Sequence, residues 1–176
     1  MLEQFLPAIK DPADYLAALS LFKADAPLTA EEAEKLLAVY AKYQTEMDDP
    51  DYLRLCLAVD LLPGRTEKDM ADFAPLGLGE KNLDALFAAK KIVTGTEELT
   101  VEKAAHIVEQ VQDETVSLPA RVLLARIALD CMAASRDYAS LREQITTLAA
   151  FLTGCGTETL DRYTTLVGEV KVKCRK

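Results

Sequence analysis

Apolar side chains recur at intervals of three and four residues along almost the whole chain, and this rhythm restricts the fold more than any other feature. The interval places them on one face of an α-helix, whereas one face of a β-strand takes every second residue. Leu2, Phe5, Leu6 and Ile9 follow it at the start of the chain. Leu and Ala supply 53 of the 176 residues, and Val and Ile supply 16. Because the first pair favours helices and the second favours strands, the sequence predicts an all-α fold.

Capping residues, prolines and glycines divide this pattern into nine or ten helices. Asp11-Pro12, Thr29, Asp49-Pro50, Thr66 and Thr100 are typical helix starts, because their side chains accept hydrogen bonds from the first free backbone N–H groups. Pro63-Gly64 and the glycines at 154 and 156 are typical helix ends. The expected helices cover about residues 2–9, 12–24, 29–46, 50–62, 66–74, 83–91, 100–111, 117–132, 138–152 and 160–170.

The arrangement of these helices has two interpretations, both with a single domain over residues 1–176. One is a compact multi-helix bundle. The other is a short right-handed solenoid of helical hairpins, because caps at Thr29, Thr66, Thr100 and Asp137 are separated by 37, 34 and 37 residues. The segment from Ala125 to Leu148 resembles one tetratricopeptide hairpin, with Tyr138 near that family's aromatic position after the turn.

Negative charge is concentrated in the first two thirds of the chain. Residues 1–60 contain 12 acidic and 5 basic side chains, residues 61–120 contain 11 and 6, and residues 121–176 contain 6 and 9. A field of this sign repels phosphate backbones and anionic lipids. The sequence therefore disfavours nucleic acid and membranes as partners and favours a protein or peptide of basic character.

The N-terminal residues and the cysteines indicate a reducing compartment. Residues 1–7 have neither the basic nor the long apolar region of a secretory signal. Cys56, Cys131, Cys155 and Cys174 are far apart, and none belongs to a Cys-x-x-Cys pair. We therefore expect a cytoplasmic protein.

Catalytic and metal-binding patterns are weak. The one histidine, His106, shares a helix face with Glu102 and Glu109, but a di-iron helix bundle needs a second Glu-x-x-His motif that the chain lacks. Cys155 lies at an expected helix C-terminus, which disfavours the reactive thiolate. We therefore expect no cofactor, no metal and no catalytic residue.

The segment from Pro75 to Lys81 resembles a helix-hairpin-helix motif. In that family a Gly-hydrophobic-Gly turn presents backbone N–H groups to a nucleic-acid phosphate, and a nearby lysine assists. Gly77, Leu78, Gly79 and Lys81 occupy the corresponding positions. Glu67, Asp69, Asp72, Glu80 and Asp84 surround them with negative charge, which opposes phosphate binding. Without a phosphate, the two glycines simply permit a sharp turn between helices.

These observations favour a non-enzymatic helical interaction or adaptor protein that binds a protein or peptide in a groove between helices. Tyr40, Tyr43, Tyr52 and Tyr163 are the candidate contact residues. The first alternative is a nucleic-acid-associated module that uses Gly77, Gly79 and Lys81 as phosphate contacts. The second is an enzyme whose site is built from carboxylates and tyrosines.

Overall fold

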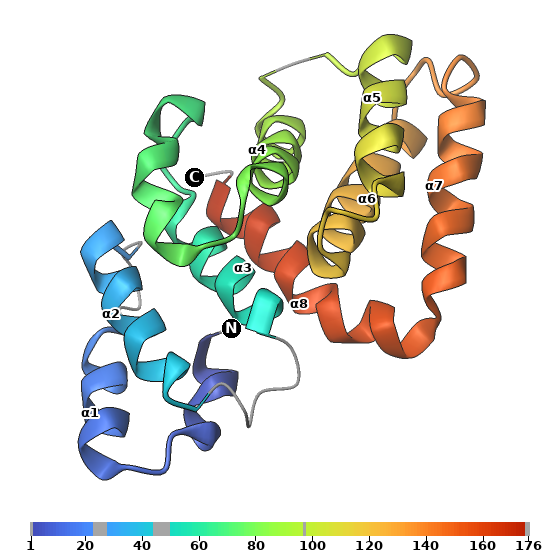
Figure 1. Cartoon of the computed structure of the whole chain (residues 1–176). Coiled ribbons are helices and arrows are strands. Elements are labelled where there is room, and N and C mark those ends of the chain that lie inside the picture. Colours follow the sequence, from blue (N-terminus) through green and yellow to red (C-terminus); the bar gives the residue numbers. More distant parts are fainter. Residues whose placement is uncertain (1, 23–27, 44–49, 97, 175–176) are drawn as a thin grey trace. The chain divides into compact units, whose positions relative to one another are not determined.

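The computed structural model describes residues 2–22, 28–43, 50–96 and 98–174 (Figure 1). These ranges contain ten helices and no strand, so the predicted all-α multi-helix bundle is confirmed. No helix within them is both long enough and apolar enough to cross a bilayer. The contacts divide the chain into two compact units, residues 1–79 (unit 1) and residues 80–176 (unit 2). The single domain over residues 1–176 stays a prediction.

Unit 1 is built around α3, the helix that the sequence marks as apolar on most sides. Leu53, Leu55, Leu57 and Leu61 of α3 are all buried. Helices α2, α3 and the 3-10 helix η3 pack against one another, whereas α1 packs against α2 and the 3-10 helix η1. The described elements of this unit are η1 (Leu2–Ala8), α1 (Pro12–Ser20), α2 (Ala30–Ala41), α3 (Pro50–Leu61) and η3 (Glu67–Leu76).

The predicted caps begin the helices of unit 1. The Asp11 carboxylate accepts hydrogen bonds from the N–H groups of Ala13 and Asp14 at the start of α1. At the start of α2, the Glu32 N–H donates to Thr29 Oγ1, and the Thr29 N–H donates to Glu32 Oε2 at 2.9 Å. Helix α1 ends at Ser20 and α2 at Ala41, earlier than the expected residues 24 and 46. Residues 24 and 46, like the proposed cap Asp49, lie outside the described ranges.

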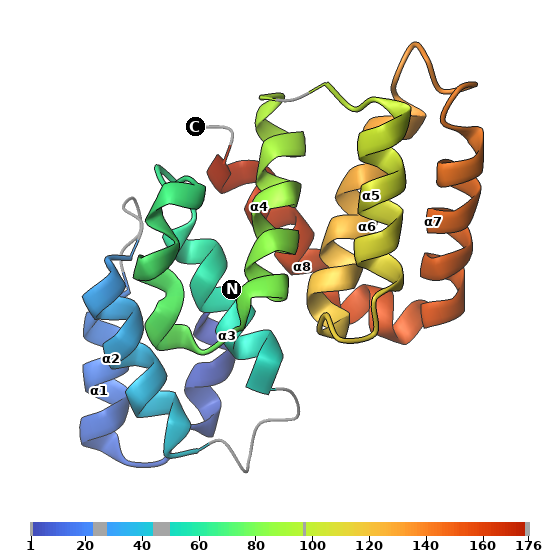
Figure 2. The ribbon, with the colours of Figure 1, turned by 45° about the horizontal axis from the view of Figure 1, so that its top comes forward.

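Unit 2 is organised by α6, whose burial extends around most of its circumference. Nine residues of this helix are buried, and α6 contacts all four of its neighbours in the unit. Helix α8 runs obliquely from the end of α7 past α6 to α4 (Figure 2). The described elements of this unit are α4 (Glu80–Thr94), α5 (Val101–Gln112), α6 (Leu118–Ala133), α7 (Arg142–Cys155) and α8 (Thr157–Cys174).

The predicted cap at Asp137 is wrong. Helix α7 begins at Arg142, with Leu141 at the N-cap. The chain between α6 and α7 makes successive turns in which the Ser140 N–H donates to the Asp137 carbonyl and the Leu141 N–H to the Tyr138 carbonyl. Leu141 is the first buried side chain after these turns, and Tyr138 is exposed. Burial of Leu141 therefore sets the start of α7, and the regular cap spacing behind the solenoid and tetratricopeptide interpretations does not extend to this helix.

Candidate functional site

An open groove with a volume of about 430 Å³ lies between α6 and α8 of unit 2. Its volume falls within the range of small-molecule and side-chain pockets. Its apolar lining comes mainly from α8, and charged side chains from both helices surround it. The lining residues are Val122, Arg126 and Asp130 of α6, and Thr157, Leu160, Asp161, Tyr163, Thr164, Val167, Gly168 and Lys171 of α8.

The spacing of the lining residues follows from helix geometry. On α6, residues 122, 126 and 130 are four apart, so they form one row along the helix. On α8, residues 157, 161, 164, 168 and 171 alternate intervals of four and three, which is the spacing of a coiled-coil seam. The α8 row carries small or polar side chains where such a seam normally has large apolar ones. This row therefore leaves open the space that a partner helix occupies in a coiled coil.

One carboxylate on the groove binds two cations. Lys171 Nζ donates to Asp130 Oδ2 at 2.8 Å, and Arg126 Nε lies 3.5 Å from Asp130 Oδ1. The side chains are partly solvent-exposed, so these ion pairs add little to stability. They leave an excess positive charge at this end of the groove, whereas Asp161 adds a negative charge on α8. The groove therefore has charges of both signs, although the chain as a whole is acidic.

The titratable side chains that line the groove are Arg126, Asp130, Asp161, Tyr163 and Lys171. The Asp130 carboxylate is paired with both Arg126 and Lys171, so it is engaged within the chain. Among the described residues, no histidine or cysteine lines the groove. Within the described ranges, no group of three or more His, Cys, Asp or Glu side chains is placed to hold a metal ion.

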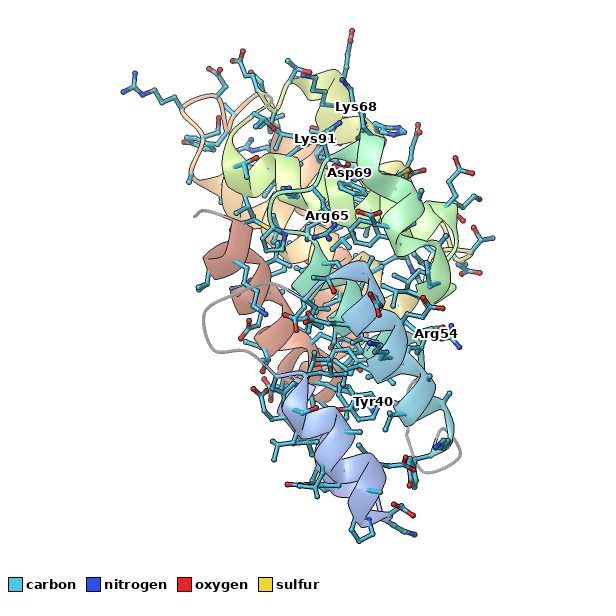
Figure 3. All side chains as sticks on the ribbon, turned by 90° about the vertical axis from the view of Figure 1, so that its left-hand side faces the viewer. Tyr40, Arg54, Arg65, Lys68, Asp69 and Lys91 are labelled. Atoms are coloured by element: carbon cyan, nitrogen blue, oxygen red, sulfur yellow. The ribbon has the colours of Figure 1, made fainter. Side chains whose placement is uncertain are left out.

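Of the four candidate tyrosines, Tyr163 is the one that lines the groove, and its side chain is almost completely buried there. Tyr40 and Tyr52 are buried in unit 1, and their ring centroids lie 5.8 and 5.9 Å from that of Phe5. The Tyr40 hydroxyl donates to the Leu2 carbonyl, and burial raises the pKa of this phenol (Figure 3). The structure thus places these two tyrosines in a core.

Tyr43 joins α1 to the end of α2. Its hydroxyl donates to Asp14 Oδ2 at 2.9 Å and accepts a hydrogen bond from the Asp11 N–H at 3.3 Å. Lys42 Nζ donates to the other oxygen of Asp14. The Tyr43 hydroxyl, followed by Lys42, holds the pKa of Asp14 below its usual value. Tyr43 therefore has a structural role within unit 1.

The turn after η3 has the backbone geometry that its glycines predict. Gly77 adopts a left-handed conformation with φ of +65°, and Leu78 is buried. Arg54 Nη1 donates to the Leu76 carbonyl at 2.6 Å, and it would lie 2.7 Å from a Cβ atom added at Gly77 (Figure 3). Glycine is therefore favoured here by φ, and a Cβ atom would in addition displace the Arg54 guanidinium, which is the end of a flexible side chain.

Lys81 is engaged within unit 2. Its Nζ donates to Asp113 Oδ2 at 3.0 Å and to Thr115 Oγ1 at 2.9 Å. The hydrogen bonds from Thr115, followed by the one from Lys81, lower the pKa of Asp113 to about 2. A phosphate would have to compete with this carboxylate for Lys81. Phosphate binding by Gly77, Gly79 and Lys81 stays a prediction.

His106 and Cys155, the side chains that the sequence analysis considered for catalysis, are not among the residues that line the groove. His106 is exposed, and its Nδ1 lies 3.8 Å from Glu109 Oε2. Burial raises the pKa of the Cys155 thiol, although the nearby Arg121 opposes this shift. A raised pKa keeps the thiol protonated at neutral pH and weakens it as a nucleophile.

Of the four tyrosines that the sequence offered as contact residues, only Tyr163 lines the groove, and the position of the groove was not predicted. The alternation of four and three residues from Thr157 to Lys171 was the available signal, but the small and polar residues in it hide the row from a search for apolar periodicity. Comparisons with protein-family models, curated proteins and solved structures found no match, so the function must be argued from the chain's own residues.

Proposed function

We propose that this chain is a non-enzymatic helical interaction protein of the adaptor kind, and that the groove between α6 and α8 binds a helical segment of a protein partner. The observation that carries the proposal is the α8 row, which has coiled-coil spacing and small or polar side chains along an open groove. Helix-in-groove binding needs such a row, because the anchoring side chains of a helix recur every three and four residues.

Gly168 supports a helical occupant. It lies inside α8, where glycine costs about 1 kcal/mol relative to alanine. A Cβ atom added there would meet no other atom within 4 Å, so packing within the chain does not require glycine. A missing side chain at this position lets the backbone of a partner approach α8 closely. Thr164, one turn earlier in the same row, is also small.

The charges of the groove define the partner further. Arg126 and Lys171 share one carboxylate, so an acidic side chain of the partner is favoured at that end. Asp161, ten residues before Lys171 on α8, favours a basic side chain about three turns away. The partner at the groove is therefore an amphipathic helix with charges of both signs.

The described cysteines support the compartment that we propose for this interaction. All four are free thiols. Free thiols are usual in the cytoplasm, where disulfides rarely persist. We therefore propose a cytoplasmic location.

A selection with displayed peptides tests the groove and does not require the identity of the partner. Phage-displayed random peptides are selected against the full chain, and the Kd of each enriched peptide is measured for wild type, Gly168→Leu and Gly154→Leu. Both glycines are helical with no atom within 4 Å of an added Cβ, but only Gly168 lines the groove. Circular dichroism verifies that the variants remain folded.

We expect enriched peptides whose Kd rises at least about tenfold with Gly168→Leu and stays unchanged with Gly154→Leu. Such peptides should also compete with one another for the chain. If no enriched peptide distinguishes Gly168→Leu from wild type, the groove is not the binding site and the proposal fails.

A further inference from the structure

Helix α1 of unit 1 has its large apolar side chains on the outside. Of its nine residues only Ala18 is buried, whereas Leu16 is 63% exposed, Leu19 is 44% exposed and Tyr15 is 37% exposed. Leu19 follows Tyr15 by four residues and Leu16 by three, so its side chain is a neighbour of each on the helix surface. We call these three residues the α1 surface. A helix that buries an alanine and exposes two leucines is the reverse of the usual amphipathic pattern.

The attachment of α1 explains how this orientation is held. Asp14 in its first turn binds both Lys42 and Tyr43, which directly follow α2. Since α1 and α2 also lie side by side, they run antiparallel (Figures 1 and 2). The hydrogen bonds from Lys42 and Tyr43 to Asp14 therefore hold the first turn of α1 at the end of α2. The exposed leucines, later in α1, lie toward the start of α2.

The unit that carries the α1 surface has an excess of acidic residues. Helix α1 contains no lysine or arginine, and the first turn of α2 carries Glu31 and Glu32, followed by the exposed Glu34. Lys35 pairs with Glu31 and offsets one of these charges. Unit 1 as a whole contains 15 acidic and 7 basic residues, compared with 14 and 13 in unit 2. An apolar surface in an acidic field attracts apolar groups flanked by cations.

We propose that the α1 surface is a second docking site, separate from the groove in unit 2, and that it binds a basic amphipathic helix of another protein. Apolar side chains of that helix cover Leu16 and Leu19, and its lysines or arginines face the acidic side chains of unit 1. Anionic lipid is disfavoured by the same negative field. A second copy of unit 1 is disfavoured because it brings like charges together.

The test uses three synthetic peptides of about five helical turns. One has a leucine stripe and lysines on the polar face, the second replaces each lysine with glutamate, and the third has the lysine peptide's composition in a scrambled order. Fluorescence anisotropy gives the Kd of each for the full chain. The variants are the pair Leu16→Ser with Leu19→Ser, and Val172→Ser as a matched control, because Val172 is an equally exposed apolar residue of unit 2.

We expect the lysine peptide to bind wild type at least about tenfold more tightly than the other two. The Leu16→Ser, Leu19→Ser variant should lose at least about tenfold in affinity, and Val172→Ser should lose none. Raising the salt from about 50 to about 300 mM should weaken binding several-fold, because the attraction between the acidic unit and the lysines is screened. These substitutions are on the surface, so unfolding midpoints should not change.

Three results would overturn this proposal. The first is equal binding of the lysine and glutamate peptides, and the second is binding that the Leu16→Ser, Leu19→Ser variant retains. The third is a dimer, or a complex with vesicles of mixed neutral and anionic lipid, that only the wild type forms, because either would assign the surface to another occupant. The groove is tested by Gly168→Leu, which should leave binding of the lysine peptide unchanged, so the two proposals fail independently.

Discussion

The two units bury their apolar side chains in different ways. In unit 2, α6 is covered by four other helices, and the ion pairs on its groove combine charges of both signs. In unit 1, α1 buries a single alanine and leaves two leucines in water, and acidic residues outnumber basic ones two to one. The net charge of −9 is therefore distributed unevenly, and unit 1 carries most of it. We therefore propose a basic partner for unit 1 and a partner of mixed charge for the groove of unit 2.

Replacing a buried leucine with alanine in each unit should have the largest effect. The two variants should show whether the units differ in stability as well as in surface charge. Leu57 of α3 and Leu124 of α6 have no exposed surface. Leu57→Ala and Leu124→Ala should each lower the free energy of unfolding by about 2 to 5 kcal/mol, since each leaves a cavity. Denaturant titration measures this loss, and hydrogen exchange locates it. Equal loss of amide protection in both units for each variant would show that the units unfold together.

Gly77→Ala tests the turn at the edge of unit 1. Alanine there must adopt a positive φ and meets the Arg54 guanidinium, so we expect a loss of about 1 to 3 kcal/mol in the free energy of unfolding. Gly64→Ala has a similar φ but open space around its Cβ, and it should lose less. In an Arg54→Ala background, the cost of Gly77→Ala should fall to that of Gly64→Ala. A cost that does not fall would mean that the guanidinium does not restrict this position.

Gly168→Ala should stabilise unit 2, whereas Gly77→Ala should destabilise unit 1. The added methyl group has space and the helix gains a better helix former, so the free energy of unfolding should rise by about 0.5 to 1 kcal/mol. The melting temperature should rise by a few degrees, which calorimetry detects. Gly154→Ala should have a similar effect from outside the groove. A destabilising Gly168→Ala would show that the chain itself needs glycine at this position.

The smallest effects concern one carboxylate in each unit. NMR titration should find the pKa of Asp14 and of Asp113 below the usual 3.8, with Asp113 at about 2. Since both values are lowered by folding, each group stabilises the fold above about pH 4, and this contribution is lost as the pH falls through the folded pKa. Tyr43→Phe should raise the pKa of Asp14, and Thr115→Val should raise that of Asp113. An unchanged pKa in either variant would contradict the hydrogen bond that the substitution removes.

Sequence alone predicted the fold class because its two signals, helical periodicity and caps, depend on nearby residues. Thr29, Thr66 and Thr100 all cap helices where expected. The prediction at Asp137 failed because α7 starts only after Leu141, which is buried, and burial depends on tertiary packing that a local pattern does not contain. The groove was missed because Asp130 and Lys171 meet only through the packing of α6 on α8. The exposed leucines of α1 resemble core residues in sequence, and only the structure shows their orientation.

The central place of α6 has a consequence for synthesis of the chain. Helix α6 ends at Ala133, but its last neighbour, α8, is complete only at Cys174. At about 5 to 20 residues per second, the ribosome needs roughly 2 to 8 seconds to add that stretch. Throughout this interval the side of α6 that carries Val122 lacks its cover. Nascent chains halted within α7 should therefore be the form of this protein that most needs a chaperone.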